Sequence, residues 1–164
     1  MYIKKGVFVN PFIDGGSQER GYRAGTENVA SIVAMAIALE KNCKTMTEHV
    51  KHLQHLEDIL VKELKASNIK FIRNGSENGL PGNINLSFLD AEGEMILHRL
   101  DLQGICISTG SACDSINTQV SHVIKAIGVS KQYAEGTIRI SLGKDNTEEE
   151  VKTIAKELIK IMVA

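Results

Sequence analysis

The sequence contains no tryptophan, and aromatic residues of all kinds make up only 4% of its 164 residues. Proteins that bind single-stranded nucleic acids stack bases on aromatic side chains, and membrane proteins carry aromatic belts at the bilayer interface. A surplus of basic charge is also lacking, because 19 Lys and Arg residues stand against 20 Asp and Glu residues. A nucleic-acid interface needs clustered basic residues. We therefore expect a protein that binds neither nucleic acid nor membrane.

Long apolar runs and a regular cysteine framework are missing as well. The longest apolar run covers residues 29–39 and is interrupted only by Ser31, whereas a membrane span takes roughly 20 residues. The first residues show no apolar stretch typical of a signal peptide. The three cysteines, Cys43, Cys106 and Cys113, are odd in number and irregular in spacing. These features predict a cytoplasmic protein with at least one free thiol.

Apolar periodicity predicts helices that alternate with short strands. The first helix begins at Thr26 or Asn28, continues to residue 37, and is apolar on nearly all sides, so we expect it to be buried. Further helices are predicted over residues 44–66, 92–102 and 120–127 and after a capping box at 147–150, and strands over 69–72, 84–88, 105–107 and 136–142. This order predicts an α/β fold, an α+β sandwich in which helices pack on one short sheet.

Cys113 lies in a run of small and polar residues, 108–115 (STGSACDS). Such neighbours leave its thiol accessible, whereas Cys106 has an isoleucine on each side and is expected in the core. A cysteine reacts as its thiolate, and a mobile loop can carry it to a separate reaction centre. The neighbouring Asp114 disfavours the thiolate. The composition supports a mobile nucleophile and an ordinary loop cysteine about equally.

Arg139 interrupts the apolar alternation of the strand predicted over residues 136–142. It shares one face of that strand with Thr137 and Ser141, while the apolar residues between them share the other. The planar guanidinium group is suited to binding a carboxylate through two hydrogen bonds. An outward-facing charge is the commoner role for such an arginine, so both interpretations stay open.

A glycine-rich segment, residues 15–28 (GGSQERGYRAGTEN), precedes the first predicted helix. Dense glycines indicate tight turns or a close approach of the backbone to a ligand. Thr26 and two arginines stand just before a helix N-terminus, where free N–H groups bind phosphate. The spacing is neither that of a P-loop nor that of a dinucleotide fingerprint. The residues alone therefore favour Thr26 as a simple helix cap.

The histidines suggest no metal site. His49, His52 and His55 recur at three-residue steps on the polar face of a predicted helix, without a cysteine pair or an inward carboxylate. We expect this face to be solvated. His122 opens a short apolar helix, and we expect it to pack against its neighbours rather than to tune Cys113.

Five segments carry a family resemblance when they are read in order along the chain. They are residues 15–28, 83–88 (NINLSF), 108–115, 138–143 (IRISLG) and 147–150 (TEEE). Together they resemble the C-terminal part of cysteine desulfurases of the NifS/IscS type, which are fold-type-I enzymes of aminotransferase class V that use pyridoxal phosphate (PLP). The cysteine segment resembles the group of this family with a long mobile catalytic loop.

The resemblance implies a role for three residues. Cys113 takes sulfur from the substrate cysteine and holds it as a persulfide, Arg139 binds the substrate α-carboxylate, and Thr26 reaches the PLP phosphate of the neighbouring subunit. The implied reaction converts L-cysteine to L-alanine, with PLP as the electron sink. The persulfide then passes to an acceptor, such as an iron–sulfur scaffold, for the assembly of iron–sulfur clusters or thio-cofactors.

The resemblance also implies that the chain is a C-terminal fragment, since the family's Schiff-base lysine lies upstream of the matching segments. Residues 1–28 are then the remnant of the large PLP domain with its glycine-rich phosphate-contact segment. Residues 29–164 are the small C-terminal domain with the catalytic cysteine loop 108–117. Without that lysine, we expect the isolated chain not to desulfurate cysteine.

A fragment of this kind leaves apolar surface without its partner. We expect exposure at Val7, Val9, Phe12 and the helix over residues 29–39. Because exposed apolar surface promotes association, we expect a homodimer, or an arm exchanged between two copies with its hinge at residues 15–25.

The residues alone also fit a protein of another class. In that case the chain is a stand-alone sulfur carrier or protein-interaction module, which uses Cys113 as a persulfide acceptor without PLP. The reading frame upstream of Met1 distinguishes the two hypotheses, because only a fragment has a large domain encoded there.

Overall fold

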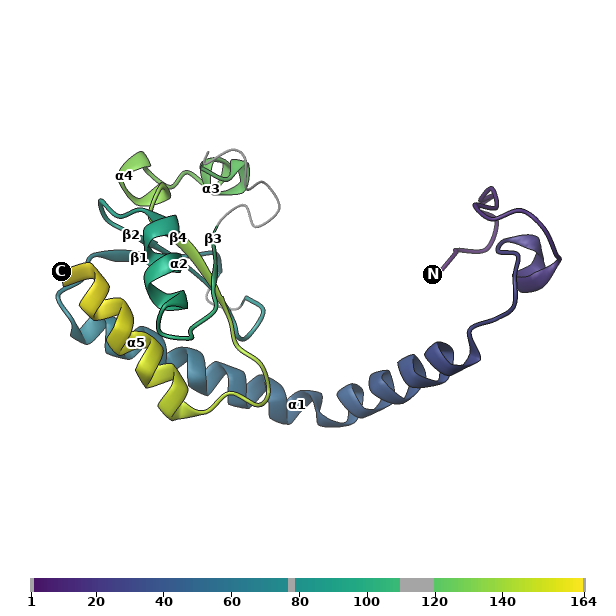
Figure 1. The fold of residues 1–164 in the computed structure, drawn as a ribbon, viewed down its shortest axis with the longest axis horizontal. Helices are drawn as coiled ribbons and strands as arrows, with labels where there is room; N and C mark the ends of the chain where they lie inside the picture. Colours follow the sequence, from purple (N-terminus) through teal and green to yellow (C-terminus); the bar gives the residue numbers. More distant parts are fainter. Residues whose placement is uncertain (1, 77–78, 110–119, 164) are drawn as a thin grey trace. The chain divides into compact units, whose positions relative to one another are not determined.

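The computed structural model describes residues 2–76, 79–109 and 120–163 (Figure 1). The chain divides into two compact units, Met1–Thr45 and Met46–Ala164, and helix α1 (Val29–Ala66) contributes residues to both. Each helix in the described part of the chain is too short or too polar to span a bilayer.

The first unit begins with a loop that is closed by its own hydrogen bonds. A short 3₁₀ helix, η1 (Gln18–Gly21), lies within it. The N–H of Gly25 donates to Oε1 of Gln18 at 3.2 Å, and the N–H of Ala24 donates to the carbonyl of Ile13 at 3.1 Å. Gly25 has a φ of 92°, a left-handed value that favours glycine. The tight turns predicted from the glycine content are therefore present.

Helix α1 is capped by Asn28 and runs without a break. Oδ1 of Asn28 accepts from the N–H of Ser31 at 3.1 Å, as an N-cap side chain does. The prediction of two separate helices is wrong, because residues 38–43 contain neither glycine nor proline. Glu40 and Lys44 form an ion pair of 2.6 Å, one helical turn apart, across the predicted gap.

The apolar start of α1 is exposed, so the predicted burial of this helix is wrong. Val29 is 62% exposed and Ile37 is 60% exposed. A helix that is apolar on all sides needs partners on all sides, and the described residues do not provide them. The exposure expected at Phe12, at Val7 and over most of residues 29–39 is confirmed, while Val9 is only partly exposed.

The second unit contains a four-stranded antiparallel sheet with the strand order β1-β2-β4-β3. Its strands are β1 (Phe71–Asn74), β2 (Asn83–Phe88), β3 (Ser108–Thr109) and β4 (Thr137–Ser141). Alternation along β2 and β4 gives the sheet one apolar face and one polar face. The apolar face carries Ile84, Leu86, Phe88, Ile138 and Ile140, and the polar face carries Asn83, Asn85, Ser87, Thr137, Arg139 and Ser141.

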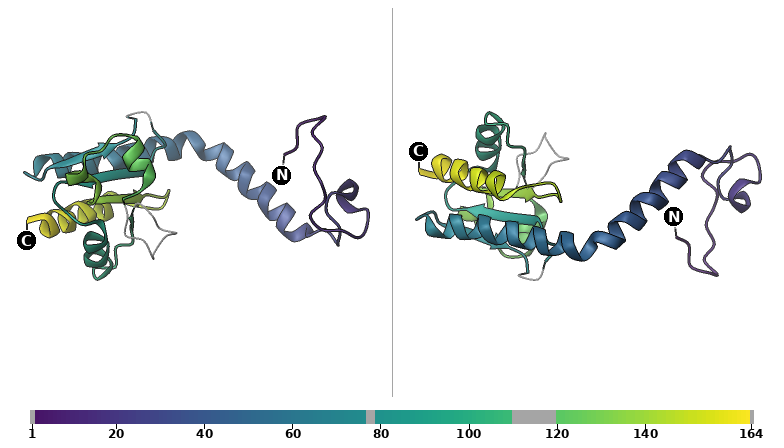
Figure 2. Two further views of the ribbon diagram at one scale, coloured as in Figure 1. Left: turned by 90° about the horizontal axis from the view of Figure 1, so that it is seen from above. Right: turned by 90° about the horizontal axis from the view of Figure 1, so that it is seen from below.

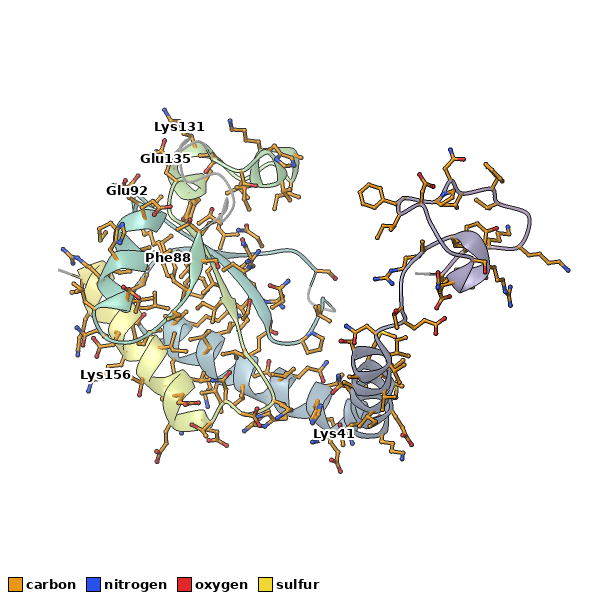
Figure 3. All side chains as sticks on the ribbon, turned by 45° about the vertical axis from the view of Figure 1, so that its right-hand side comes forward. Lys41, Phe88, Glu92, Lys131, Glu135 and Lys156 are labelled. Atoms are coloured by element: carbon orange, nitrogen blue, oxygen red, sulfur yellow. The ribbon has the colours of Figure 1, made fainter. Side chains whose placement is uncertain are left out.

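Helices cover the apolar face and form one core with it. The second part of α1, α2 (Gly93–Asp101) and α5 (Glu148–Val163) supply the helical side, and Figure 2 shows α2 and α5 beside the strands. Phe88, labelled in Figure 3, lies within this core and is fully buried. The helical residues of the core are Leu56, Leu60, Leu64, Ile96, Leu100, Val151, Ala155 and Leu158. The predicted fold class is confirmed.

The predicted capping box starts helix α5. The N–H of Thr147 donates to the carboxylate of Glu150 at 2.8 Å, and the N–H of Glu150 donates to Oγ1 of Thr147 at 3.3 Å. The backbone hydrogen bond from Thr147, followed by one from the Asn146 side chain, holds the pKa of Glu150 below its ordinary value. Local sequence is therefore sufficient to define this helix start.

The region before β4 differs most from the predicted elements. The strand predicted over residues 105–107 pairs instead at Ser108–Thr109, opposite Arg139 and Ile138. Cys106 is exposed rather than buried, because the isoleucines that flank it turn toward the core and leave it on the opposite side. Two short helices, α3 (His122–Ala126) and α4 (Lys131–Ala134), precede β4. The sequence pattern predicts the first of them but not the second.

Candidate functional site

Arg139 occupies the middle of the polar sheet face. In the register of the strands, Asn85 of β2 lies opposite Arg139 on one side, and Ser108 of β3 lies opposite it on the other. Asn74 of β1 lies opposite Asn85 and extends this row to the edge strand. Residues directly opposite one another in an antiparallel pair share a face of the sheet. The strands therefore bring four polar side chains into one row across the sheet.

The guanidinium group of Arg139 is available to a ligand. Its side chain is exposed, and within residues 2–76, 79–109 and 120–163 no hydrogen bond or ion pair engages it. Arg73 provides the contrast, because its half-buried guanidinium donates to the carboxylate of Glu57 and to the carbonyl of Ser76 at 3.1 Å. Of these two arginines on the sheet, only Arg139 has donors without a partner among the residues that the structure describes, and such donors suit an anion.

A chain of hydrogen bonds runs through the polar face beside Arg139. Nδ2 of Asn74 donates to Oδ1 of Asn85 and to Oγ of Ser87, both at 2.7 Å. Oγ of Ser87 lies 2.7 Å from Oγ1 of Thr137, which donates to the carbonyl of Ala134 at 2.8 Å. Ser87 and Thr137 are buried. The hydrogen bonds therefore fix the rotamers of these side chains on three neighbouring elements.

Thr26 lies in the first unit and is not the cap of α1. Asn28 takes that role, so the simple-cap interpretation of Thr26 is wrong. The carbonyl of Thr26 accepts from Nη1 of Arg23 at 3.1 Å. Its side chain is exposed, and in the described part of the chain nothing hydrogen-bonds to its hydroxyl group. The hydroxyl group is thus free to contact a ligand near the start of the helix.

Cys113 lies outside the described residues, as does most of the predicted catalytic loop 108–117. Its role stays a prediction. The two cysteines that the structure does describe, Cys43 and Cys106, are both exposed and unpaired.

The histidines of α1 support structure rather than a metal centre. Nε2 of His52, which is half-buried, lies 2.9 Å from the carbonyl of Asn146, and Nε2 of His55 lies 2.9 Å from Oε1 of Glu148. The hydrogen bond from His55, followed by one from Lys152, lowers the pKa of Glu148. Among the residues placed by the structure, no group of three metal-ligating side chains exists. His52 thus departs from the solvated face expected for these histidines.

His122 does not pack as predicted. Its side chain is exposed at the start of α3, whereas Ile124 provides the buried contact of that helix. A one-turn helix buries only the residues on its inner side, and His122 is not one of them.

The described residues alone do not enclose a PLP molecule. A hollow of about 620 Å³ lies in the second unit, but neither Thr26 nor Arg139 lines it. Its two lysines, Lys65 and Lys70, are exposed, whereas a Schiff-base lysine is activated by desolvation or a neighbouring cation. The resemblance assigns Thr26 to the cofactor phosphate and Arg139 to the substrate carboxylate, and the lining of this hollow contains neither residue.

Asn74 and Asn85 lie in the same row as Arg139, although no motif of the sequence predicts this. Asn85 alternates with apolar neighbours in the predicted strand just as Arg139 does, which is a signal that both face away from the core. Pairing of the two across β2 and β4 depends on the register, and no local pattern defines that register.

The family model described as Aminotransferase class-V matches residues 11–154. The cysteine desulfurase IscS of Dictyoglomus turgidum is 43% identical over 163 residues, which are 99% of this chain and 41% of that protein. The cysteine desulfurase NifS of Azotobacter vinelandii is 37% identical over 99% of this chain and 40% of its own length.

A solved structure called NifS-like protein is also similar to the chain. It has a TM-score of 0.83 and 39% identity, and the match covers 99% of this chain and 41% of that one. The chain thus spans about two fifths of the length of these relatives. Because the family model matches most of the sequence, the chain belongs to the aminotransferase class-V family, together with proteins named cysteine desulfurase IscS and NifS.

Proposed function

We propose that this chain is part of a cytoplasmic cysteine desulfurase, and that Arg139 binds the α-carboxylate of the substrate L-cysteine. One observation carries the proposal: an exposed guanidinium without a partner among the described residues lies in the middle of a polar sheet face. A structural arginine is paired, as Arg73 is with Glu57. An unpaired guanidinium fork instead suits a small carboxylate, which it binds through two parallel hydrogen bonds.

Cys113 is the proposed sulfur acceptor. Its thiolate attacks the sulfur of the substrate and forms an S–S bond, while the bond between that sulfur and Cβ breaks. The electron pair of the broken bond stays on the carbon, which takes up a proton to give L-alanine. No external oxidant or reductant is needed, because cysteine and a thiol become alanine and a persulfide.

PLP is the cofactor implied by the family, and when bound it withdraws electrons from Cα of the substrate. Thr26 is proposed to contact its phosphate across a homodimer interface, and its free hydroxyl group supports this role. Residues 1–28 then belong to the cofactor-binding part of the protein, and residues 29–164 form the smaller domain with the loop 108–117.

The persulfide is proposed to pass to an acceptor protein, such as an iron–sulfur scaffold. Cys113 must first reach the substrate to take up its sulfur. The persulfide must then reach an external partner. The transfer is proposed to involve the run of small and polar residues that carries Cys113, 108–115.

The test uses the protein expressed from the complete reading frame that encodes this chain, loaded with PLP. We expect it to release alanine from L-cysteine, and we expect Cys113→Ser to abolish that release. Arg139→Ala should raise KM strongly, whereas the matched variant Arg99→Ala, an exposed arginine of α2, should not. Equal kinetics for the two arginine variants would refute the assignment of Arg139.

The 164-residue chain by itself is a second arm of the test. With PLP added, we expect no alanine release, because the described residues do not enclose the cofactor. Turnover by this chain alone would show that it suffices to bind PLP, and would contradict the proposal that it is one part of the enzyme.

A further inference from the structure

The direction of the hydrogen-bond chain on the polar face follows from counting protons. The carbonyl of Ala134 can only accept, so the hydroxyl of Thr137 donates to it at 2.8 Å. A hydroxyl group has one proton, so Thr137 has none left for Ser87. Ser87 therefore donates its own proton to Oγ1 of Thr137 across 2.7 Å. The carbonyl of Ala134 therefore determines the direction in which both hydroxyl groups, of Thr137 and of Ser87, donate.

The same counting fixes the side-chain amide of Asn85. Because Ser87 has used its proton, it accepts from Asn74, and the contacting atom of Asn74 is Nδ2. This nitrogen has two protons, and the second one points to Asn85 at 2.7 Å. The contacting atom of Asn85 is therefore its oxygen. A flipped amide at either position would set donor against donor or acceptor against acceptor.

Nδ2 of Asn85 is left with two protons to donate. Within the described ranges it has no hydrogen-bond partner, and the side chain is only partly buried. Asn85 lies directly opposite Arg139 in the β2–β4 pair, where Cβ atoms are about 5 Å apart. An amide donor and a guanidinium donor, both without partners in the described part of the chain, therefore lie side by side on the same face.

We propose that Asn85 is a second substrate-binding residue, which donates from Nδ2 to the carboxylate bound by Arg139. Asn74 is the positioning residue that fixes the amide of Asn85 in this orientation. The proposal rests on the function proposed above, and it adds a residue from β2 to that site. A carboxylate offers about four lone-pair positions, of which a guanidinium fork occupies two. The amide of Asn85 takes one of those that remain.

Nuclear magnetic resonance on the isotopically labelled 164-residue chain tests this directly. The probe is L-alanine, the carboxylate product, and the control probe is L-alaninamide, which lacks the carboxylate. We expect L-alanine to shift the side-chain resonances of Arg139 and Asn85, while L-alaninamide shifts neither. If L-alanine shifts neither side chain in the wild-type chain, this inference is contradicted, whereas the proposed function is tested by alanine release from the PLP-loaded protein of the complete reading frame.

Variants separate the role of Asn85 from that of Arg139. Asn85→Ala should weaken L-alanine binding about tenfold, the effect of one charge-assisted hydrogen bond. The matched truncation Asn83→Ala, at an exposed residue on the same strand and face, should leave binding unchanged. Arg139→Ala should abolish binding. The backbone spectrum of each variant reports whether the fold is intact.

Asn74→Ala tests the positioning role. We expect binding to weaken several-fold and the two amide protons of Asn85 to exchange faster with water, because Oδ1 of Asn85 loses its partner. A merely structural role would change the stability of the fold but leave L-alanine binding unchanged. Unchanged binding in Asn74→Ala would therefore overturn the positioning role of Asn74.

Two outcomes distinguish the proposals. If Arg139→Ala abolishes binding but Asn85→Ala has no effect, the inference about Asn85 is wrong while the proposed function stands. If Arg139→Ala binds L-alanine as the wild type does, the carboxylate site of the proposed function is itself wrong.

Discussion

Thr137→Val is the sharpest test of the buried hydrogen-bond chain. Valine has nearly the shape of threonine, but it neither accepts from Ser87 nor donates to the carbonyl of Ala134. Ser87 is fully buried and Thr137 is 4% exposed, so water does not replace these partners. Each unpaired buried group costs about 1–3 kcal/mol, and the added methyl group returns roughly 0.8 kcal/mol. Two unpaired groups less one methyl group give about 1–5 kcal/mol, so we expect a net loss of about 3 kcal/mol in the free energy of unfolding.

Urea denaturation followed by circular dichroism measures this loss, and Thr153→Val is the matched control. Thr153 lies exposed on α5, where its hydroxyl donates to the carbonyl of Glu149 at 2.8 Å. Water solvates this carbonyl in the variant, so we expect a change below about 0.5 kcal/mol. Equal losses for the two variants would refute the argument that buried partners, rather than the loss of a hydroxyl as such, determine the cost.

Three further perturbations test the core and the start of α5. Leu60→Ala removes a fully buried core side chain and should lower the free energy of unfolding, measured by chemical denaturation, by about 3 kcal/mol. A decrease below about 1 kcal/mol would contradict the assigned core. Thr147→Ala removes the capping hydroxyl group and should lower the free energy of unfolding in the same denaturation assay by about 1 kcal/mol. An unchanged free energy of unfolding would show that this cap does not stabilise α5. The pKa values of Glu148 and Glu150 are lowered in the folded protein. The ionised carboxylates therefore stabilise the fold above their ordinary pKa, and this contribution is lost as the pH falls through the lowered pKa. Thermal melts should therefore show stability decreasing as pH drops below about 4.5, and Glu150→Gln should flatten that decrease rather than leave it unchanged.

Local signals in the sequence predict local structure well. The capping box at Thr147 and Glu150 forms as expected, since its hydrogen bonds join residues three positions apart. The strand alternation around Arg139 correctly places Ile138 and Ile140 in the core and Arg139 on the open face. Such features depend only on neighbouring residues and on the period of two in a strand.

Features set by distant contacts are not predictable in the same way. Cys106 has apolar neighbours, but its exposure follows from how the isoleucines beside it meet the core. The partnership of Asn85 with Asn74 and Arg139 depends on the register of three strands. Residues 29–39 are apolar enough for burial, but burial needs a surface to pack against. Each of these depends on which segments meet rather than on local sequence.

Cys113 is proposed to receive sulfur from L-cysteine bound at Arg139. This transfer is measured by mass spectrometry of the protein expressed from the complete reading frame, loaded with PLP and treated with L-cysteine. We expect one added sulfur atom on the peptide that contains Cys113, and we expect it to be absent in Arg139→Ala under limiting substrate. Sulfur found on Cys43 or Cys106 but not on Cys113 would refute the proposed role of Cys113.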